Sequence, residues 1–308
     1  ERLVLGAGSS TSVSGEGVIV PYGVLRNNEH WRDPAQVVID ESDPTLGLLT
    51  APPEKRIELK APDVAMADGA VVDIAGGGDL YAWEFVPGPG GSHDILTQPG
   101  MYAILPDYQG PALGAGAAAG DRVWLAGGDG LAAGWYTLLP ARYALLPGAF
   151  AVQATSHSWT GVAAESVAAA DGSLVMPGRR GSAYGGAQDA QASAWRVLSG
   201  QIIRRYTEYN EAMANDFFSS DAFKLTRYRL TGQDIVTPRL PRDGGAAVFS
   251  AGQALTLDGE LRSRAAAGGR GGLVDITGDK IAIVGAGLDA SDLIGQGFLM
   301  IDAQDLSG

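Results

Sequence analysis

A short glycine motif near the end of the chain has the spacing of a dinucleotide-binding turn. The G-x-G-x-x-A sequence at 285–290 follows an apolar segment at 280–284, and Asp302 ends a second apolar segment. In a nucleotide-binding βαβ unit, such glycines let the backbone approach a pyrophosphate and the acid binds a ribose hydroxyl. Only residues 289–296 remain for a crossover helix, whereas a βαβ unit needs about 30 residues. We therefore interpret 285–290 as a turn and expect no cofactor.

A second glycine motif suggests calcium chemistry. Residues 76–79 (GGGD) are typical of calcium-binding repeats, and Asp79, Glu84 and Asp94 could supply oxygen ligands to one Ca²⁺. The nonapeptide iteration of such repeats is absent from the sequence. We therefore expect three solvated loop acids and no metal.

Residues for nucleophilic or acid–base catalysis do not form a recognisable set. His30, His93 and His157 lie in unrelated segments, without a serine elbow or a metal-binding spacing. Sugar-cleaving enzymes use pairs of carboxylates, and nothing in the sequence indicates which of the many acids would converge. The chain is predicted not to be an enzyme, with a glycan-binding or glycan-cleaving β-helical protein as the alternative.

Aromatic residues are concentrated between residues 76 and 161. Trp83, Trp124, Trp135 and Tyr143 could form a stacking platform for sugars or contact another partner. In a subdomain rich in Ala, Gly and Pro, however, such aromatics more often form the core. The core interpretation is favoured, and these four residues are the candidate glycan or partner contacts.

Short alternating segments are the elements that would position these residues. Segments 57–60, 64–66 and 71–74 each alternate apolar and polar residues, with a turn at 67–69. Each segment is too short to be stable alone, so stacking on neighbouring segments must supply the core. The sequence therefore predicts one coil of a β-solenoid.

An internal repeat supports the solenoid. Residues 69–76 (GAVVDIAG) recur at 271–278 (GGLVDITG) with five of eight positions identical, and 8–15 is a weaker echo. Asp73 and Asp275 are expected to face outward, between inward Val and Ile side chains.

Composition points to the same class. The 308 residues include 45 Gly and 16 Pro, which suit many short strands better than helices. Cysteine is absent, which fits either chance or export of the unfolded chain through an oxidising compartment. The net charge of −13 disfavours nucleic acid as a partner. No apolar run reaches the roughly 18 residues that a membrane span requires.

The order of these segments predicts an all-β chain of coils with insertions. The helix candidate is the stretch 188–225, in which 188–195 and 209–214 contain no Gly or Pro; Gly200 divides it, and residues 202–206 could equally form a strand. The expected parts are coils at 1–75 with a loop excursion at 23–53, an aromatic-rich β insertion at 76–161, a return coil at 162–185, a partly helical insertion at 186–244, and coils at 245–308.

Several stretches resemble the filamentous haemagglutinin family, and together they cover nearly the whole chain. The specific ones are 76–88 (GGGDLYAWEFVPG) and 136–149 (YTLLPARYALLPGA). Further matching stretches are VPYG at 20–23, PPEKRI at 52–57, GAVVDI at 69–74, YAILP at 102–106 and RRYTEYN at 204–210.

This resemblance implies a segment of a very large exoprotein of Gram-negative bacteria, exported by two-partner secretion. The implied fold is a right-handed parallel β-helix with extra-helical insertions. The implied partners are an outer-membrane β-barrel transporter during export and then a host, neighbouring-cell or matrix surface. The implied role is adhesion, aggregation or biofilm structure at the cell surface. The family's Asn-Pro-Asn secretion motifs are missing, so we interpret the chain as an internal segment or a mature fragment. Its uncapped coil ends are expected to pair with neighbouring chain or with another copy.

Overall fold

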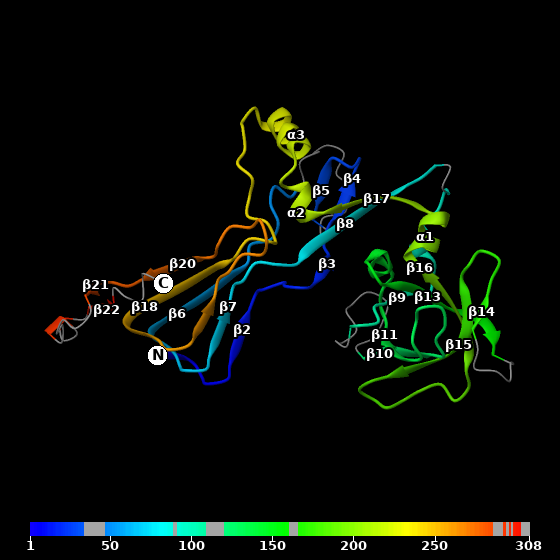
Figure 1. The fold of residues 1–308 in the computed structure, drawn as a ribbon, viewed down its shortest axis with the longest axis horizontal. Coiled ribbons are helices and arrows are strands. Elements are labelled where there is room, and N and C mark those ends of the chain that lie inside the picture. The colour runs from blue at the N-terminus through cyan, green and yellow to red at the C-terminus, as the bar shows by residue number, and fades with distance from the viewer. Residues whose placement is uncertain are drawn as a thin grey trace. The chain divides into compact units, whose positions relative to one another are not determined.

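The computed structural model describes residues 1–33, 47–88, 91–108, 120–159, 166–285, 292–293, 296 and 298–302. With 45% strand and 13% helix it is mostly β-sheet, which confirms the prediction of an all-β chain. The chain divides into two compact units (Figure 1). We call Glu1–Ala82 with Ala212–Gly308 the parallel unit, and Trp83–Glu211 the antiparallel unit.

The parallel unit is built from short strands that pair with strands distant in the sequence. Its sheets have the orders β1-β6-β18-β20, β2-β7-β19 and β3-β8-β17, and the pairs in the first two are parallel. The strands of these sheets are β1 (Arg2–Leu5), β2 (Ser10–Ser12), β3 (Ile19–Pro21), β6 (Arg56–Met66), β7 (Val71–Asp73), β8 (Asp79–Val86), β17 (Glu208–Met213), β18 (Ala246–Leu257), β19 (Glu260–Arg262) and β20 (Leu273–Thr277). A further parallel pair joins β21 (Ile281–Val284) to β22 (Leu299–Asp302).

The chain crosses these three sheets once with β1, β2 and β3 and again with β6, β7 and β8, and we call each crossing a pass. Successive passes keep a common register. The sequence offset between paired residues is the same for β1 with β6 as for β2 with β7, and it is almost the same for β3 with β8. One pass therefore pairs with the next along three separate ladders. Between β18 and β20 the offset is less than half as long. The pairs that define these offsets are Arg2 with Asp63, Ser10 with Val71, Ile19 with Asp79, and Ala246 with Leu273.

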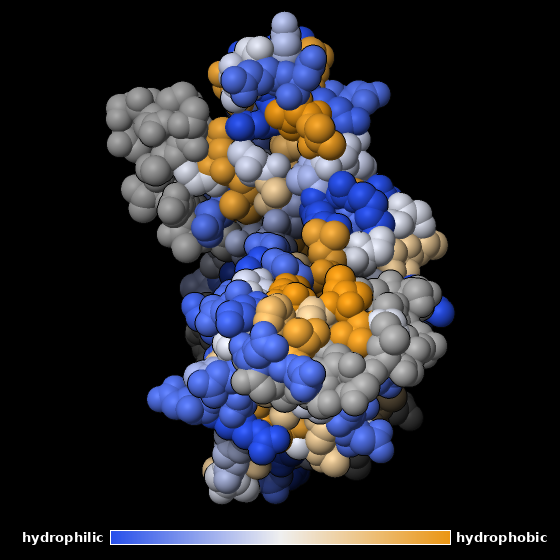
Figure 2. Space-filling view, turned by 90° about the vertical axis from the view of Figure 1, so that its left-hand side faces the viewer, coloured by the Kyte–Doolittle hydropathy of each residue, from blue (hydrophilic) through white to orange (hydrophobic). Residues whose placement is uncertain are grey.

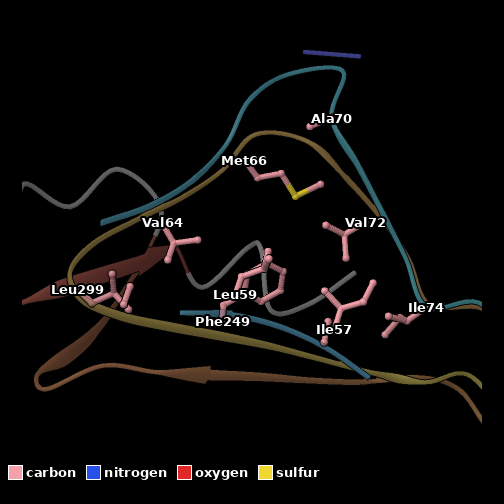
Figure 3. Close-up of a cluster of buried hydrophobic side chains, with 11 residues drawn as sticks. Ile57, Leu59, Val64, Met66, Ala70, Val72, Ile74, Phe249 and Leu299 are labelled. Carbon is pink, nitrogen blue, oxygen red and sulfur yellow. The ribbon is translucent and has the colours of Figure 1, made fainter. Parts of the chain in front are cut away.

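The core of the parallel unit is built largely by one such pass, with further residues from later strands, among them Phe249 on β18 and Leu299 on β22. Figure 3 shows side chains from three consecutive segments of the chain pointing into a single apolar cluster. The first segment contributes Ile57 and Leu59, the second Val64 and Met66, and the third Ala70, Val72 and Ile74. Val72 and Ile74 are fully buried on either side of Asp73, as the alternation predicted.

A smaller aromatic core lies in the expected loop excursion at 23–53. Here β4 (Val24–Arg26) and β5 (His30–Arg32) form an antiparallel hairpin. Trp31 is 1% exposed and packs against Phe217 and Phe218, with ring centroids 5.4 and 5.3 Å away. These phenylalanines belong to the segment with helices α2 (Ala214–Phe217) and α3 (Asp221–Thr231).

The antiparallel unit is one sheet that nearly closes on itself. Its order is β11-β10-β15-β16-β13-β9-β12, with β14 paired to β15. The terminal strands of this path, β11 and β12, follow one another in the chain, so the sheet is a near-barrel. The strands are β9 (Met101–Ile104), β10 (Asp121–Leu125), β11 (Gly134–Thr137), β12 (Leu139–Pro140), β13 (Phe150–Ser158), β14 (Val167–Ala168), β15 (Leu174–Ser182) and β16 (Ser193–Ser199).

The interior of the near-barrel is apolar. Its most buried residues include Ile104, Val123, Leu125, Met176 and Trp195. The short helices of this unit are η2 (Ile95–Thr97), η3 (Ala141–Leu145) and α1 (Gly200–Tyr206).

The structure differs from the expected return coil at 162–185. Residues 162–165 lie outside the described residues, and those from 166 onward belong to the antiparallel unit. Strand β15 pairs antiparallel with β10, β14 and β16. The expected insertions at 76–161 and 186–244 therefore share one sheet, and the continuous inserted unit is 83–211.

The expected helices are also placed differently. Strand β16 begins at Ser193 within the first candidate, 188–195, and strand β17 occupies most of the second, 209–214. Pairing with β13 and β15 fixes residues 193–199 as a strand, because cross-strand packing overrides local helix propensity. Helices 200–206 and 214–217 lie inside the candidate stretch 188–225, and helix 221–231 begins in it. Residues 202–206, for which a strand was the alternative, are helical.

Candidate functional site

Two of the candidate tryptophans meet on the outer face of the near-barrel. Trp124 on β10 lies directly opposite Trp135 on β11, and Arg179 on β15 lies opposite Trp124 on the other side. Arg122 is two residues before Trp124, so it points to the same face. All four side chains are partly exposed. We call Arg122, Trp124, Trp135 and Arg179 the Arg–Trp face.

The alternating neighbours of these residues fix the orientation of the face. Val123 and Leu125 on β10 are fully buried, and Tyr136 on β11 is 7% exposed. All three belong to the interior core. Because successive strand residues point to opposite sides of a sheet, the Arg–Trp face points away from that core.

Two contacts hold the Trp135 ring. The guanidinium carbon of Arg122 lies 4.2 Å from the ring centroid, within cation–π range. On β15, the ring lies so close to Gly181 that a Cβ there would come within 2.9 Å of Trp135 Cη2. The Nε of Arg122 is shielded and has no hydrogen-bond partner among the described residues. The ring is thus held in place on the face.

Positive charge on this face is not neutralised by acids on the same strands. The outward positions of β10, β11 and β15, all of them described, contain no Asp or Glu. The neighbouring Arg180 points the other way and pairs with Asp121, at 2.5 Å between Nη2 and Oδ2. Within the part of the chain that the structure describes, the Arg179 guanidinium has no ion pair.

The substitution Gly181→Val should displace the Trp135 ring. A side chain at Gly181 would also come within 3.0 Å of the carbonyl oxygen of Ala187, so overpacking should cost about 1–3 kcal/mol. Tryptophan emission and near-ultraviolet circular dichroism should both change relative to the wild type. Gly185→Val is the control, because the nearest atom to a Cβ there is 3.8 Å away. Equal spectra for the wild type and Gly181→Val would show that the ring does not rest on this strand.

The other two candidate aromatics lie in different elements. Trp83 is on β8, and Tyr143 is in η3 with the Arg142 guanidinium 5.8 Å from its ring centroid. Both are partly exposed, like the residues of the Arg–Trp face. The structure therefore brings together Trp124 and Trp135 only. The two arginines were missed, although the alternation in DRVWL at 121–125 places Arg122 on the same face as Trp124.

A second polar cluster in this unit is internally satisfied. Asp171 accepts hydrogen bonds from the Ser173 hydroxyl at 2.6 Å, the Tyr206 hydroxyl at 2.5 Å and the Arg196 guanidinium at 2.5 Å. The hydrogen bond from the Ser173 hydroxyl has the largest effect on the pKa of Asp171, followed by that from Tyr206. Together these hydrogen bonds outweigh the opposing effect of burial and hold the pKa well below its usual range. This carboxylate is therefore ionised and engaged, and it is poorly suited to transfer protons near neutral pH.

The acids of the candidate calcium site have other partners. Asp79 accepts from the backbone N–H groups of Leu80 and Asn215, and Asp94 accepts from Leu96 N–H and the Tyr209 hydroxyl. Among the described residues, no group of three or more His, Cys, Asp or Glu is placed to hold a metal ion. His30 is on β5 and His93 is in a loop, while the side chain of His157 and residues 286–290 of the glycine motif lie outside the described set.

Two hollows in the parallel unit, of about 280 and 300 Å³, share segment 52–55 in their linings. Lys55 lines both, and its Nζ donates to the carbonyl oxygens of Pro241, at 2.7 Å, and Ala75, at 3.3 Å. Burial lowers the pKa of Lys55, against the attraction of Asp243 and Asp73. The ammonium joins segments distant in the sequence, so its role is structural.

Figure 2 shows one face of the surface, where apolar groups are surrounded by hydrophilic residues. Exposed apolar side chains of the parallel unit include Leu273, Val274, Ile281 and Ile283 on β20 and β21. Within the described residues, no helix is long and apolar enough to cross a membrane.

No protein-family model, curated protein or solved structure matches the chain. The family resemblance therefore stays a prediction.

Proposed function

We propose that the chain is a non-enzymatic segment of a surface exoprotein, in which a right-handed parallel β-helix forms a stiff shaft. The observation that supports this most is the common register of the parallel unit. Two of its ladders have the same sequence offset between partners, and a third has nearly the same offset. A coil requires this, because each pass must stack on the same next pass on every side. In such a shaft, backbone hydrogen bonds run along the axis between strands about 4.8 Å apart.

The inserted units are then the parts that make contacts. The antiparallel unit is a continuous insertion in the sequence of the parallel unit. Such an arrangement suits a protein in which the shaft supplies length and the insertion supplies surface. The lack of cysteine suits export of an unfolded chain through an outer-membrane transporter. We therefore infer a role in adhesion or aggregation at the surface of a Gram-negative cell.

The coil register can be tested by cross-linking, since the chain has no cysteine of its own. Ser10 and Val71 are paired on β2 and β7, so Ser10→Cys with Val71→Cys should form a disulfide on mild oxidation. The control is Ser10→Cys with Asp73→Cys, a shift of two residues or about 6.6 Å along the strand, which exceeds disulfide reach. Electrophoresis without reductant measures both. Equal cross-linking in the two variants would contradict the stacked register.

The adhesive role is tested by coating beads with the folded chain. Coated beads should aggregate or attach to cultured epithelial cells or to a bacterial lawn more than beads carrying heat-unfolded chain. Coated beads that neither aggregate nor attach to either surface would overturn the proposed function.

A further inference from the structure

Helix α3 of the parallel unit packs on its surroundings by one face only. Phe223 is 5% exposed, and its ring lies against two further phenylalanines, with ring centroids 5.5 and 5.1 Å away. Thr226, Arg227 and Leu230 line a small hollow together with residues of the β4–β5 hairpin. Residues three or four apart lie on one side of a helix, so these four residues define the packed face of α3.

The opposite face of α3 presents two large side chains to solvent. Leu225 and Tyr228 are each 49% exposed. With a rotation of about 100° per residue, both lie on the side of the helix opposite to Phe223. They are three residues apart and therefore neighbours on the helix surface. The outward face of α3 thus has an apolar centre, where a surface helix normally carries polar residues.

Basic side chains flank this apolar centre. By the same rotation, Lys224 lies on one side of the line from Leu225 to Tyr228, and Arg229 lies on the other. Both are at least partly exposed. Helix α3 has three basic residues against one acidic residue, Asp221, in a chain with a net charge of −13. Asp221 is in the first turn and pairs with Lys224 at 3.4 Å, so the second half of the helix carries the unbalanced positive charge.

This pattern is that of a helix that lies on a lipid surface. Apolar side chains enter the head-group layer, and basic side chains beside them attract anionic lipids. Tyrosine is enriched at this depth of a membrane, and Lys and Arg reach outward while their stems cover apolar surface. We propose that α3 docks the chain on an anionic lipid bilayer, with Leu225 and Tyr228 in the head-group layer and Lys224 and Arg229 facing lipid phosphates.

A bilayer fits this face better than a protein partner. Two half-exposed side chains offer far less area than the roughly 800 Å² per partner that a stable protein interface buries. A bilayer requires no matching groove, and electrostatic attraction adds to a small apolar contact. We expect one copy to bind weakly and reversibly, and many copies on one particle to bind firmly.

This proposal rests on the adhesive function and names a lipid surface as the partner. Binding of the purified chain is measured by flotation with vesicles of phosphatidylcholine alone and with vesicles that also contain phosphatidylglycerol. We expect binding to the anionic vesicles only, weakening as salt is added. Equal binding to the two kinds of vesicle, or binding to neither, would overturn the proposal.

The matched apolar variants are Leu225→Ser and Leu273→Ser. Each removes one exposed leucine from the parallel unit, and Leu273 is 54% exposed on β20. Leu225→Ser should weaken binding to anionic vesicles by about fivefold, as loss of a half-buried leucine contact does, and Leu273→Ser by less than about twofold. Circular dichroism confirms that both variants are folded. Equal effects of the two would mean that α3 is not the docking surface.

The matched charge variants are Arg229→Gln and Arg264→Gln. Both residues are exposed, and Arg264 lies in the parallel unit outside α3. Arg229→Gln should weaken binding by about fivefold, since a basic residue loses its attraction only if it lies near the anionic surface. Arg264→Gln should change binding by less than about twofold. A larger effect of Arg264→Gln would move the contact away from α3 and overturn the proposal.

The lack of cysteine permits a direct test of insertion. Leu225→Cys and, separately, Leu257→Cys on β18 are labelled with a fluorophore whose emission reports polarity. On anionic vesicles, emission should shift to the blue for the label at 225 and stay unchanged for the label at 257. A shift at neither position, or an equal shift at both, would contradict insertion through α3.

The two proposals fail separately. If anionic vesicles do not bind while coated beads still attach to cells, the lipid proposal fails and the adhesive function stands. If Leu225→Ser instead changes the oligomeric state measured by light scattering, and vesicles do not bind, the face belongs to a contact with another copy and the lipid proposal is again overturned. Vesicle binding that depends on Leu225 and Arg229, with beads that attach to no cell, supports the lipid contact and removes the adhesive function.

Discussion

The substitution Phe249→Ala should destabilise the parallel unit by about 3–5 kcal/mol, the range for truncating a buried phenylalanine. Phe249 is 1% exposed, on the strand that pairs with both β6 and β20. Its cross-strand neighbours are Leu59 and Ile276, and all three contact one core. Truncation would leave a cavity between passes that are held together by this packing. Hydrogen exchange of the β18 peptide in increasing urea, read by mass spectrometry, measures the loss.

Two further variants of the same strand test the cause. Leu257 is 40% exposed, so Leu257→Ala should cost less than about 1 kcal/mol. Phe249→Leu keeps most of the volume and should recover most of the lost stability. Comparable destabilisation by Phe249→Ala and Leu257→Ala would mean that the centre of β18 does not form the core.

The substitution Asp243→Asn should cost about 3 kcal/mol at neutral pH, as removal of one partner of a buried charged network does. Asp243 is 2% exposed. Its carboxylate accepts from the backbone N–H groups of Leu240 and Arg270 at 2.9 and 2.8 Å, and from the Arg270 guanidinium. The amide of asparagine can satisfy only part of this set. The control is Glu260→Gln, whose ion pair with Arg262 is exposed and should matter little.

The effect of Asp243→Asn should depend on pH. Burial alone would raise the pKa of Asp243, but hydrogen bonds from the Arg270 side chain and from the backbone of Arg270 and Leu240 outweigh it, so the pKa is lowered. A carboxyl whose pKa is lower in the folded state stabilises the fold above its unfolded pKa of about 3.9, and this contribution is lost as pH falls through the folded value. The stability difference between wild type and variant should therefore shrink below about pH 4. A difference that stays constant from pH 7 to pH 3 would exclude the charge as its cause.

Local alternation was sufficient to predict strands with inward apolar residues between 56 and 74, because each segment has one face in the core. The first two expected strands, 57–60 and 64–66, form the single strand β6. Asp73 between the buried Val72 and Ile74 is the clearest example. Local patterns succeed here since the three segments that enclose the core are consecutive in the chain.

The same rules failed for β15 because its small residues serve packing. Pro177, Gly178 and Gly181 are turn signals in sequence, yet all three lie within a strand. A Cβ at Gly178 would come within 2.5 Å of Trp195 Cδ1, and one at Gly181 would meet Trp135. These glycines leave room for tryptophans from other strands, which a single sequence does not reveal.

The internal repeat was informative about strands but misleading about register. The two most similar copies of the repeat, 69–76 and 271–278, contain β7 and β20, and these strands lie in different sheets. The weaker echo, 8–15, is the one that stacks on 69–76, since Ser10 pairs with Val71 and Ser12 with Asp73. Similar turn and strand residues suit any side of a coil, so identity does not identify the stacking partner.

The site was predictable only in part. The aromatic enrichment identified Trp124 and Trp135, and their pairing follows from a hairpin of neighbouring strands. Arg179 is distant from Trp124 in the chain and reaches it only through the pairing of β10 with β15. Such long-range pairing has no local signal in one sequence.

The pairing of β8 with β17 has an evolutionary consequence. These strands carry the two ends of the antiparallel unit, and they belong to one sheet. The entry and exit of the inserted segment are therefore neighbours, as in domains that can be exchanged by recombination. Different lobes can be grafted at this position while the strands of the parallel unit keep their register. If the proposed function holds, related chains change the surface that they present without any change in the parallel unit.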